Sequence, residues 1–249
     1  MQLFYTEELL EDSTQCELAE NEVHHVANVL RLGVGEAITL TNGKGLLGKG
    51  SIVVATKKRV TIALQKVLKT PQPAYHNLSL AVGLLKNRDR MEWLAEKATE
   101  VGIGKLIWMH TSRSERGKVR LDRMEGVVTA AMKQSLQMWK PAVELAGFHA
   151  IMDGAAAGNQ QIIMAHEKAT ESIDLSVDQT AKPTLLLVGP EGGFTPEEVE
   201  NVVKVGGKSL LISRNRLRTE TAALTLLQYY HLRLFSGNSS PDKLMDYFM

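Results

Sequence analysis

The sequence predicts an α/β protein in which a parallel sheet covered by helices is preceded by a small β-rich domain. Between residues 75 and 235, short apolar runs alternate with segments of helical periodicity, as in parallel strands joined by helices on both faces of the sheet. Before residue 70, short β-branched runs are separated by glycine-rich turns. Two prolines in the segment 70–74 favour an extended connector, so we expect domains at 1–70 and 74–249.

Composition excludes several classes of protein. The 249 residues contain 44% apolar residues, which is ordinary for a soluble globular protein, and no apolar run is long enough to span a membrane. The acidic N-terminus lacks the layout of a secretory signal. The single cysteine, Cys16, excludes an internal disulfide and a cysteine-clustered metal site and suits a reducing cytosol. We therefore expect a cytoplasmic protein without a membrane or metal partner.

The N-terminal domain is expected to hold four strands and one helix. A hairpin turn with a flexible tip is predicted at Asn42-Gly43 and the following glycines 45, 48 and 50. Glu22–Leu32 has helical spacing. Adjacent His24 and His25 cannot share one helix face, so packing or capping is the simpler interpretation of these histidines. The expected strands are Leu3–Thr6, Ala37–Leu40, Ser51–Ala55 and Val60–Val67.

Charge is segregated along this nearly neutral chain. Residues 37–70 carry seven bases and no acid, and residues 201–218 carry five bases and no acid. Such runs can form positive faces that bind a polyanion. They can equally be solvated edges, since lysine on an edge strand prevents aggregation.

The first half of the larger domain predicts two strand–helix units. Leu78–Leu84 and Lys105–Met109 are the strands. We expect Asp89 and Glu92 to form a capping box for the first helix, which ends at Gly102. Asp122 and Glu125 are expected to do the same for the second helix.

The next segment, 142–180, has a weaker pattern. Gln161–Ala165 has the composition of a strand, and Ala155–Gly158 has that of a helix end or a loop. The terminal segment Asp242–Met249 fits a docked strand or a turn.

A glycine-rich loop follows the buried-type strand Thr184–Val188. Its sequence, GPEGG at residues 189–193, lets a backbone approach a ligand closely. It lacks the spacing of a dinucleotide or phosphate loop, and Glu191 would repel a phosphate. We expect Thr195 to cap the next helix, with Pro196 at its first position and Glu198 completing a capping box.

An arginine-rich loop follows the next strand, Ser209–Ser213. Arg214, Arg216 and Arg218 precede a helix that begins with small residues. By composition alone, this could be an arginine-rich surface loop before a capped helix. Two successive strand–loop–helix units, however, place their loops at the carboxyl edge of a parallel sheet, where such sheets bind ligands.

GPEGGF followed by LRTETAA resembles the SPOUT methyltransferases and, within them, the ribosomal RNA uridine-N3 methyltransferases of the RsmE type. The resemblance covers about 25–225 and includes further segments in the same order. Asn28 stands where an arginine is common in that family, and KQSL at 133–136 replaces a more usual Glu-Gln-Ser-Gly. The supporting segments are His24-His25-Val26, Val29-Leu30-Arg31, Met91-Glu92-Trp93, 96–102, Arg113-Ser114 and Gln134-Ser135.

The resemblance implies a fold, a cofactor and partners. The C-terminal sheet should contain a deep trefoil knot, the N-terminal domain should be a PUA-like RNA-binding β-barrel, and the enzyme should be a homodimer. The substrate should be small-subunit (16S) ribosomal RNA or the small ribosomal subunit. The cofactor should be S-adenosyl-L-methionine, held by Leu187, Val188, Gly189, Pro190, Glu191, Gly192, Gly193, Ile212, Ser213, Leu217, Arg218, Thr219, Ala222 and Ala223.

Methylation of uridine N3 requires removal of a proton or stabilisation of the base anion. Arg218 and Arg113 are candidates for orienting the base and stabilising its negative charge. Glu220 is a candidate proton acceptor, although a carboxylate at a helix N-terminus is also favourable on dipole grounds alone. The candidate RNA-binding residues are His25, Arg31, Lys57, Lys58, Arg59 and Arg116.

Two other functions remain open from the sequence. One is ribose 2′-O-methylation of another RNA by an enzyme of the same superfamily. The other is a non-catalytic RNA-binding or ribosome-assembly factor that uses the same basic faces.

Overall fold

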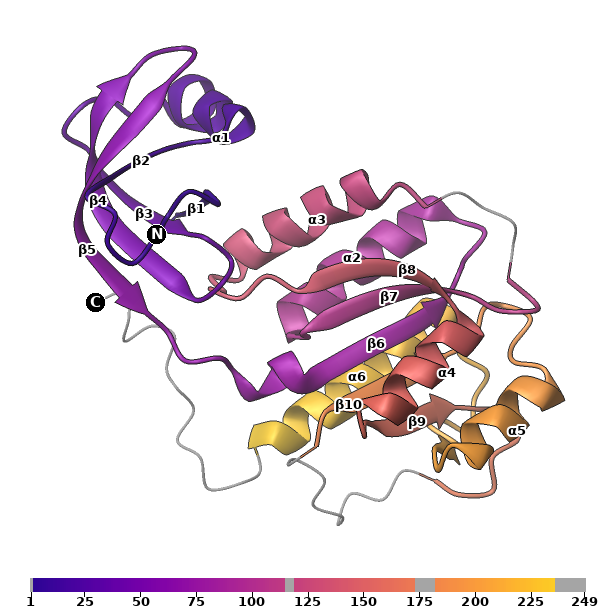
Figure 1. Ribbon diagram of the computed structural model, residues 1–249. Coiled ribbons are helices and arrows are strands. Elements are labelled where there is room, and N and C mark those ends of the chain that lie inside the picture. The colour runs from indigo at the N-terminus through magenta and orange to yellow at the C-terminus, as the bar shows by residue number, and fades with distance from the viewer. Residues whose placement is uncertain (1, 115–118, 173–181, 236–249) are drawn as a thin grey trace. The chain divides into compact units, whose positions relative to one another are not determined.

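A computed structural model describes residues 2–114, 119–172 and 182–235. The chain forms two compact units (Figure 1). Of the described residues, one unit contains those up to Pro73 together with Thr129–Lys140, and the other contains Ala74–Val128 and those from Pro141 to Phe235. Each unit has its own sheet, and the α/β class predicted from the sequence is confirmed.

The first unit is built on a five-stranded sheet in the order β1-β3-β4-β5-β2. Strands β1 and β3 are parallel and the other pairs are antiparallel. At the two edges of the sheet, the Thr6 hydroxyl next to β1 donates to the Glu17 carbonyl of β2, at 3.0 Å. The strands are β1 (Leu3–Tyr5), β2 (Gln15–Glu17), β3 (Ala37–Thr41), β4 (Leu46–Ala55) and β5 (Val60–Lys69).

Strand β4 starts earlier than the glycine pattern predicted. Gly48 and Gly50 lie inside β4 and not in a flexible tip. A register shift occurs between Lys49 and Gly50, and a Cβ at Gly50 would collide with the Ala63 carbonyl of β5. Gly50 is therefore required because two strands approach each other closely here. The glycine pattern of the sequence had indicated a turn at this position. Short β2 was missed because three residues carry too little pattern.

The predicted helix Glu22–Leu32 is wrong in its geometry. Helix α1 (Glu20–His24) passes into a π-helical segment, η1 (His25–Leu30). Arg31 ends it in the left-handed region, with φ of 57°, and its N–H donates to the Val26 carbonyl. Val23 and Val26 are buried against the sheet, so tertiary packing sets the path of this segment.

Asn42 organises the β3–β4 turn. Its side-chain oxygen accepts from Lys44 N at 2.8 Å and Leu46 N at 3.1 Å, and its amide donates to the Leu9 carbonyl at 3.1 Å. The residue is only 7% exposed. Gly43 follows with φ of +67°, as the predicted turn requires.

We expect Asn42→Ala to lower the free energy of unfolding by about 2 kcal/mol, because two N–H groups, that of Leu46 being buried, and one buried carbonyl lose their partner. Urea unfolding followed by circular dichroism measures the change. Asn28→Ala, at an exposed position of η1, is the control and should change stability by less than about 0.5 kcal/mol. Equal effects of the two substitutions would contradict the role given to Asn42.

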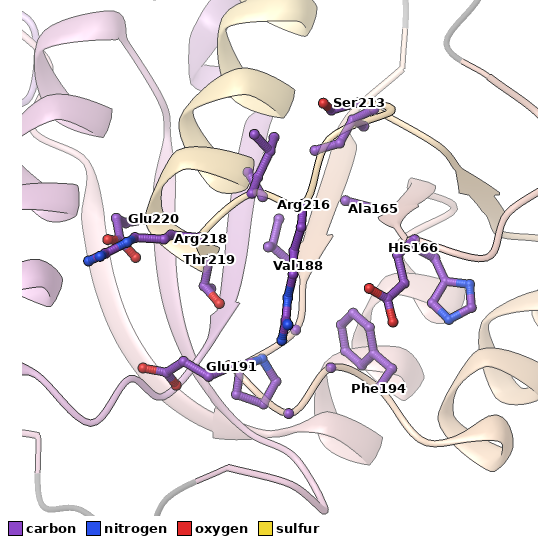
Figure 2. Close-up of a pocket in the computed structure, with 18 of the residues that line it drawn as sticks. Ala165, His166, Val188, Glu191, Phe194, Ser213, Arg216, Arg218, Thr219 and Glu220 are labelled. Carbon is purple, nitrogen blue, oxygen red and sulfur yellow. The ribbon is translucent and has the colours of Figure 1, made fainter.

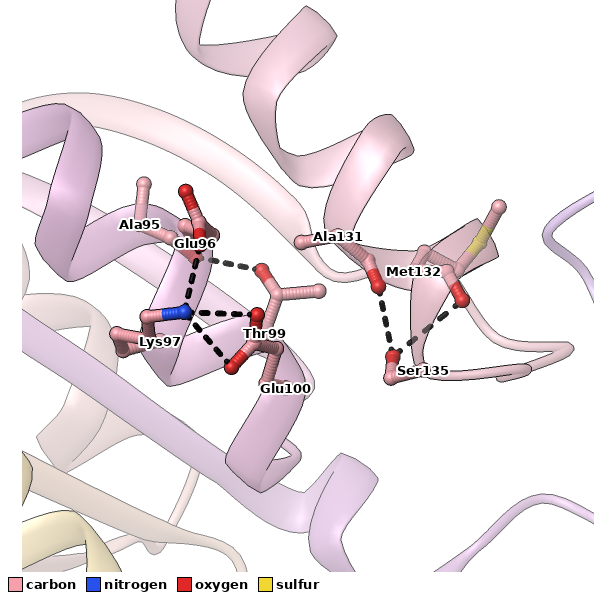
Figure 3. A network of polar contacts seen from close by, with 8 residues as sticks. All are labelled: Ala95, Glu96, Lys97, Thr99, Glu100, Ala131, Met132 and Ser135. Carbon is pink, nitrogen blue, oxygen red and sulfur yellow. Dashed lines mark hydrogen bonds and ion pairs between the residues drawn. The ribbon is translucent and has the colours of Figure 1, made fainter.

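The two departures from the family pattern near residue 135 have structural counterparts. Lys133 forms an ion pair with Glu22, whose side chain is 2% exposed. Leu136 adopts φ of 57°, a conformation that glycine adopts without strain. The Ser135 hydroxyl donates to the Ala131 carbonyl at 2.7 Å (Figure 3). Lys133 is thus accommodated by its buried partner Glu22, and Leu136 by a strained backbone conformation.

The second unit contains a six-stranded sheet in the order β11-β9-β10-β6-β7-β8. All five neighbouring pairs are parallel, as predicted. The pattern at 142–180 was too weak to identify β8 and the helix after it, because β8 has no buried residue. The strands are β6 (Leu78–Gly83), β7 (Lys105–His110), β8 (Ala142–Gly147), β9 (Gln161–Ala165), β10 (Thr184–Val188) and β11 (Lys208–Leu210).

Helices cover both faces of this sheet (Figure 1). Alternate strand residues such as Leu80 and Leu186 pack in one core with residues of α2, α3 and α6. Their neighbours, such as Ala81 and Leu187, pack in a second core with residues of α4 and α5. The helices are α2 (Arg88–Val101), α3 (Leu121–Gln134), α4 (Phe148–Ala157), α5 (Pro196–Lys204) and α6 (Thr219–Phe235), and a 3-10 turn, η2 (Ala74–Asn77), precedes β6.

Two predicted helix caps are wrong. Asn87, not Asp89, caps α2, accepting from Asp89 N at 2.8 Å. Helix α3 begins before Asp122, and that carboxylate pairs with Arg120 at 2.6 Å. Helix α2 is capped two positions before Asp89, and α3 starts one position before Asp122, which is the scale on which sequence patterns misplace helix ends.

Within the described residues, no helix is long and apolar enough to cross a membrane. The same part of the chain contains no cluster of His, Cys, Asp or Glu placed to hold a metal ion. The predicted terminal element Asp242–Met249 lies outside the described residues.

Candidate active site

A cavity of about 670 Å³ lies at the carboxyl edge of the six-stranded sheet. Loops that follow β7, β9, β10 and β11 contribute to its wall, together with the first turns of α2 and α6. Figure 2 shows Glu191 and Phe194 on one side of this space and the start of α6, with Arg218, Thr219 and Glu220, on another. The volume is that of a small-molecule site.

The glycine loop after β10 is held by close backbone packing. Every residue of β10 is buried. Gly193 has φ of +67°, and a Cβ at Gly189 would come within 3.1 Å of the Gly193 carbonyl carbon. A Cβ at Gly83 of β6 would lie inside van der Waals contact of Pro190. The loop therefore depends on its own glycines and on Gly83 in the neighbouring strand β6.

Glu198 joins two loops of the site. The predicted cap of α5 is confirmed: Thr195 accepts from Glu198 N at 3.3 Å, and Glu198 Oε2 accepts from Thr195 N at 2.8 Å. The other carboxylate oxygen, Oε1, accepts from Ser112 N in the loop after β7, at 2.8 Å. Glu198 is 3% exposed, so one buried carboxylate links the β7 loop to the β10 loop.

We expect Glu198→Gln to destabilise the protein by about 1–3 kcal/mol and to weaken ligand binding in the cavity. An amide has one acceptor atom, so one of the two N–H groups would face an NH₂ group without a partner. Urea unfolding and ligand titration measure the two effects. Glu197→Gln, at an exposed neighbouring position, is the control, and a matching loss in that variant would contradict the bridging role.

Arg113 contacts the glycine loop directly. Its Nη1 donates to the Gly192 carbonyl at 3.0 Å and to the Phe194 carbonyl at 3.2 Å. A Cβ at Gly192 would lie 3.1 Å from Arg113 Cβ. The guanidinium thus braces the loop from the cavity side, a contact that the sequence did not indicate.

The arginine-rich loop leads into α6 at the cavity. Arg216 and Arg218 are exposed, whereas Thr219 and Glu220 are each 8% exposed. Arg90 from the first turn of α2 lies with its Nε 3.6 Å from Glu220 Oε1. The first turns of α2 and α6 therefore share an ion pair in the wall of the cavity.

A third loop, after β9, was missed. Ala165, His166, Glu167 and Lys168 line the cavity, and His166 N donates to the Leu210 carbonyl at 3.0 Å. Burial lowers the pKa of His166, Lys168 lowers this pKa further, and Glu167 opposes the shift. The predicted strand Gln161–Ala165 could have revealed this loop. In a parallel sheet the carboxyl end of that strand lies at the same edge as the glycine-rich and arginine-rich loops.

The structure brings most of the predicted site residues together. Arg113, Arg218 and Glu220 line the cavity, as do all the predicted cofactor residues except Leu187 and Ala223. Leu187 and Ala223 are fully buried in the two cores. Their roles toward a ligand stay predictions. Besides the β9 loop, the lining residues absent from the predicted set are Arg90, Phe194, Leu211, Asn215 and Arg216.

The predicted RNA-binding residues lie in the first unit, apart from Arg116, which is outside the described residues. His25 begins η1 and Arg31 ends it. Lys57 and Lys58 are exposed in the turn between β4 and β5, where the Thr56 hydroxyl accepts from Lys58 N at 3.3 Å. Arg59 forms an ion pair with Glu17.

A two-unit chain with a ligand cavity at the edge of a parallel sheet matches a known class of protein. The model of the RNA methyltransferase domain matches residues 71–231, and the model of the RNA methyltransferase PUA domain matches residues 18–65. The first match spans more than half of the chain, which therefore belongs to the RNA methyltransferase family. The family resemblance of GPEGGF and LRTETAA is confirmed.

Curated relatives within this class are named ribosomal RNA small subunit methyltransferase E. The protein from Rickettsia conorii is 32% identical over 233 residues, which cover 92% of this chain and 94% of the relative. The protein from Bacillus subtilis is 26% identical over 249 residues, covering 94% and 96%.

Solved structures of other proteins are similar to this chain over almost its whole length. The probable rRNA-methyltransferase from Porphyromonas gingivalis has a TM-score of 0.86 and 28% identity, covering 95% of this chain and 99% of the other. Ribosomal RNA small subunit methyltransferase E from Neisseria gonorrhoeae, solved bound to S-adenosyl methionine, has a TM-score of 0.79 and 29% identity, covering 91% and 95%.

Proposed function

We propose that this protein uses S-adenosylmethionine to methylate N3 of a specific uridine in small-subunit (16S) ribosomal RNA. The observation that carries the proposal is the cavity at the carboxyl edge, which contains both the acidic glycine loop and the arginine-rich loop. The curated relatives with similar sequences over the same length act, by their names, on small-subunit ribosomal RNA.

The residues present fit S-adenosylmethionine. Its adenosine would find apolar walls, including Val188, Phe194 and Ile212, and the glycines expose backbone groups for hydrogen bonding. Glu167 and Glu191 provide negative charge for the cationic methionine part. When bound, this cofactor supplies a methyl group on a sulfonium. The chain has to position the cofactor beside the base and exclude competing water.

The cationic side chains of the cavity suit a nucleic acid substrate. Five cationic side chains and three carboxylates line it, and a surplus of positive charge favours a polyanion. We propose that Arg218 orients the base and stabilises its negative charge. Arg113, which binds the glycine loop, contributes by positioning that loop.

We propose that residues 1–70 form a PUA-like domain that grips RNA, followed by the catalytic domain over 74–249 with the trefoil knot of its superfamily. The match of residues 18–65 to the RNA methyltransferase PUA domain supports the first part. Because phosphate contacts position RNA without reading sequence, exposed Lys57 and Lys58 suit this role.

We infer a homodimer that acts in the cytoplasm. A shallow groove between α2 and α6 supports the dimer: Trp93, Leu224 and Tyr229 line it, and Trp93 is 44% exposed. Lys97, paired with Glu96 and Glu100 at its rim (Figure 3), gives both signs of charge to a self-complementary surface.

Trp93→Glu should convert the dimer to a monomer in sedimentation velocity.

Primer extension and calorimetry test the function. We expect S-adenosylmethionine to bind in isothermal titration, and the enzyme to create a reverse-transcriptase stop at one uridine of small-subunit ribosomal RNA. No binding up to millimolar cofactor would support a non-catalytic RNA-binding factor instead. An alkali-resistant linkage without loss of base pairing would show ribose 2′-O-methylation. The same assays on a naked fragment and on the assembled subunit identify the substrate.

Replacing Lys57 or Lys58 by alanine should weaken RNA binding about equally for all sequences. Each substitution should reduce the slope of log affinity against log salt by about one, because one phosphate contact is lost. Fluorescence anisotropy with RNA over a range of salt concentrations measures the slope. Lys105→Ala, which removes a partly exposed lysine at the start of β7 and outside both basic runs, is the control. An unchanged slope in the first two variants would remove the N-terminal domain from the RNA interface.

A further inference from the structure

Arg90 and Glu220 form a pair that the proposed chemistry has not yet used. Both residues line the cavity, and Arg90 Nε lies 3.6 Å from Glu220 Oε1. The Glu220 side chain is 11% exposed and that of Arg90 is 36% exposed. The carboxylate is therefore set back in the wall, and the guanidinium is the more accessible member of the pair.

This position disfavours Glu220 as the group that takes a proton from the substrate. Protonation of Glu220 would leave Arg90 without its counter-charge and would remove a negative charge from the first turn of α6, where a carboxylate is favourable. A general base also has to reach the proton that it removes. The more accessible member of the pair is the cation.

The guanidinium can serve two acceptors at once. Arginine has five N–H donors in a planar fork. An ion pair made through Nε engages one edge of the fork, and the edge that carries the Nη hydrogens can then face a second acceptor. The negative charge of a deprotonated uracil ring is shared among N3, O2 and O4. A guanidinium that donates to one carbonyl oxygen, O2 or O4, therefore stabilises the anion and leaves the N3 electron pair free.

We propose that Arg90 stabilises the anionic form of the substrate base, and that Glu220 acts as the positioning residue that holds Arg90 in place. The inference rests on the proposed function and assigns a role to each member of the pair. The uridine N3–H bond breaks, its electron pair stays on the ring as the anion that Arg90 compensates, and the proton passes to solvent water or buffer. The N3 electron pair is then available to form the new N–CH₃ bond.

The other charged groups of the cavity lie on different loops. Arg113 binds carbonyls of the glycine loop, and Glu191 Oε1 accepts from Lys86 N at 3.3 Å. Glu167 and Lys168 come from the loop after β9, and Arg216 and Arg218 from the loop before α6. These groups are the same in the wild type and in every Arg90 or Glu220 variant. A difference in pH dependence between the variants and the wild type is therefore assigned to the substituted residue.

The test is single-turnover methylation of small-subunit ribosomal RNA at saturating S-adenosylmethionine, measured from pH 6 to pH 10. The variants are Arg90→Ala, Arg90→Lys, Glu220→Gln and the double variant Arg90→Ala/Glu220→Gln. Arg88→Ala is the matched control, because Arg88 is an exposed arginine in the same helical turn. Cofactor affinity by calorimetry and thermal melting of every variant accompany the rates.

We expect Arg90→Ala to slow methylation by about 10²- to 10³-fold near neutral pH with cofactor affinity unchanged. The deficit should shrink as pH rises, because uridine then ionises without help, and added guanidinium ion should restore part of the rate. Arg90→Lys should recover only part of it, since an ammonium lacks the planar fork. Glu220→Gln should keep much of the activity, and the double variant should be no slower than Arg90→Ala.

Three results would overturn the inference. The first is a Glu220→Gln variant that is as slow as Arg90→Ala, whose rate no longer rises with pH, and whose loss of rate multiplies with that of Arg90→Ala in the double variant. This result would make Glu220 the proton acceptor. The second is a loss of cofactor affinity in Arg90→Ala at unchanged rate. The third is equal loss in Arg88→Ala. A wild-type protein that binds no cofactor would instead defeat the proposed function, so the two failures are distinct.

Discussion

Gly83→Ala is expected to abolish tight cofactor binding, lowering affinity by at least about 100-fold, and to cost about 1–3 kcal/mol of stability through overpacking. A Cβ at this position would collide with the backbone nitrogen and ring of Pro190 and lie 2.9 Å from its Cα. Strand β6 is paired on both sides, by β10 and β7, and cannot retreat. The glycine loop has to move instead.

Isothermal titration with S-adenosylmethionine and urea unfolding measure the two effects of Gly83→Ala. Gly147→Ala is the matched control, at the end of β8, where a Cβ would meet nothing within 4 Å. That variant should retain cofactor affinity and stability to within about 0.5 kcal/mol. Normal cofactor binding by Gly83→Ala would mean that the position of the glycine loop, which contains Pro190, is not critical for the site.

Arg113→Ala is expected to lower cofactor affinity by about 10- to 100-fold. Two hydrogen bonds from a charged donor to the Gly192 and Phe194 carbonyls disappear. Each such bond contributes about 1.5–3 kcal/mol, and the exposure of Arg113 reduces that figure. Because these bonds set the shape of the loop, the loss should appear in binding as well as in the methylation rate.

Calorimetry and single-turnover kinetics separate the two possible roles of Arg113. Arg120→Ala removes another exposed arginine of the same region, one that pairs with Asp122, and should leave both measurements unchanged. Unchanged cofactor affinity in Arg113→Ala combined with a large fall in rate would restore Arg113 to the role first predicted for it, direct stabilisation of charge on the base.

Much of the fold could be predicted because its signals are local. Alternating buried runs and helical periodicity gave the parallel sheet, and the Thr195 cap was correct because a capping box lies within four residues. Prediction failed where tertiary contacts dominate. The π-helical path of His25–Leu30, the glycine inside β4 and the exposed β8 depend on neighbours that are distant in sequence.

The sequence alone determined the family, the two loops at the sheet edge and the kind of ligand that they suit, because glycine, carboxylate and arginine side chains at fixed spacing carry chemistry that can be recognised locally. Only the tertiary structure decided how those residues act together. It directed Arg113 to the carbonyls of the glycine loop, added the loop after β9 to the cavity, and paired Glu220 with Arg90, 130 positions away along the chain. The physical reason is that an ion pair or a packing contact depends on distance in space, which spacing in a sequence does not define.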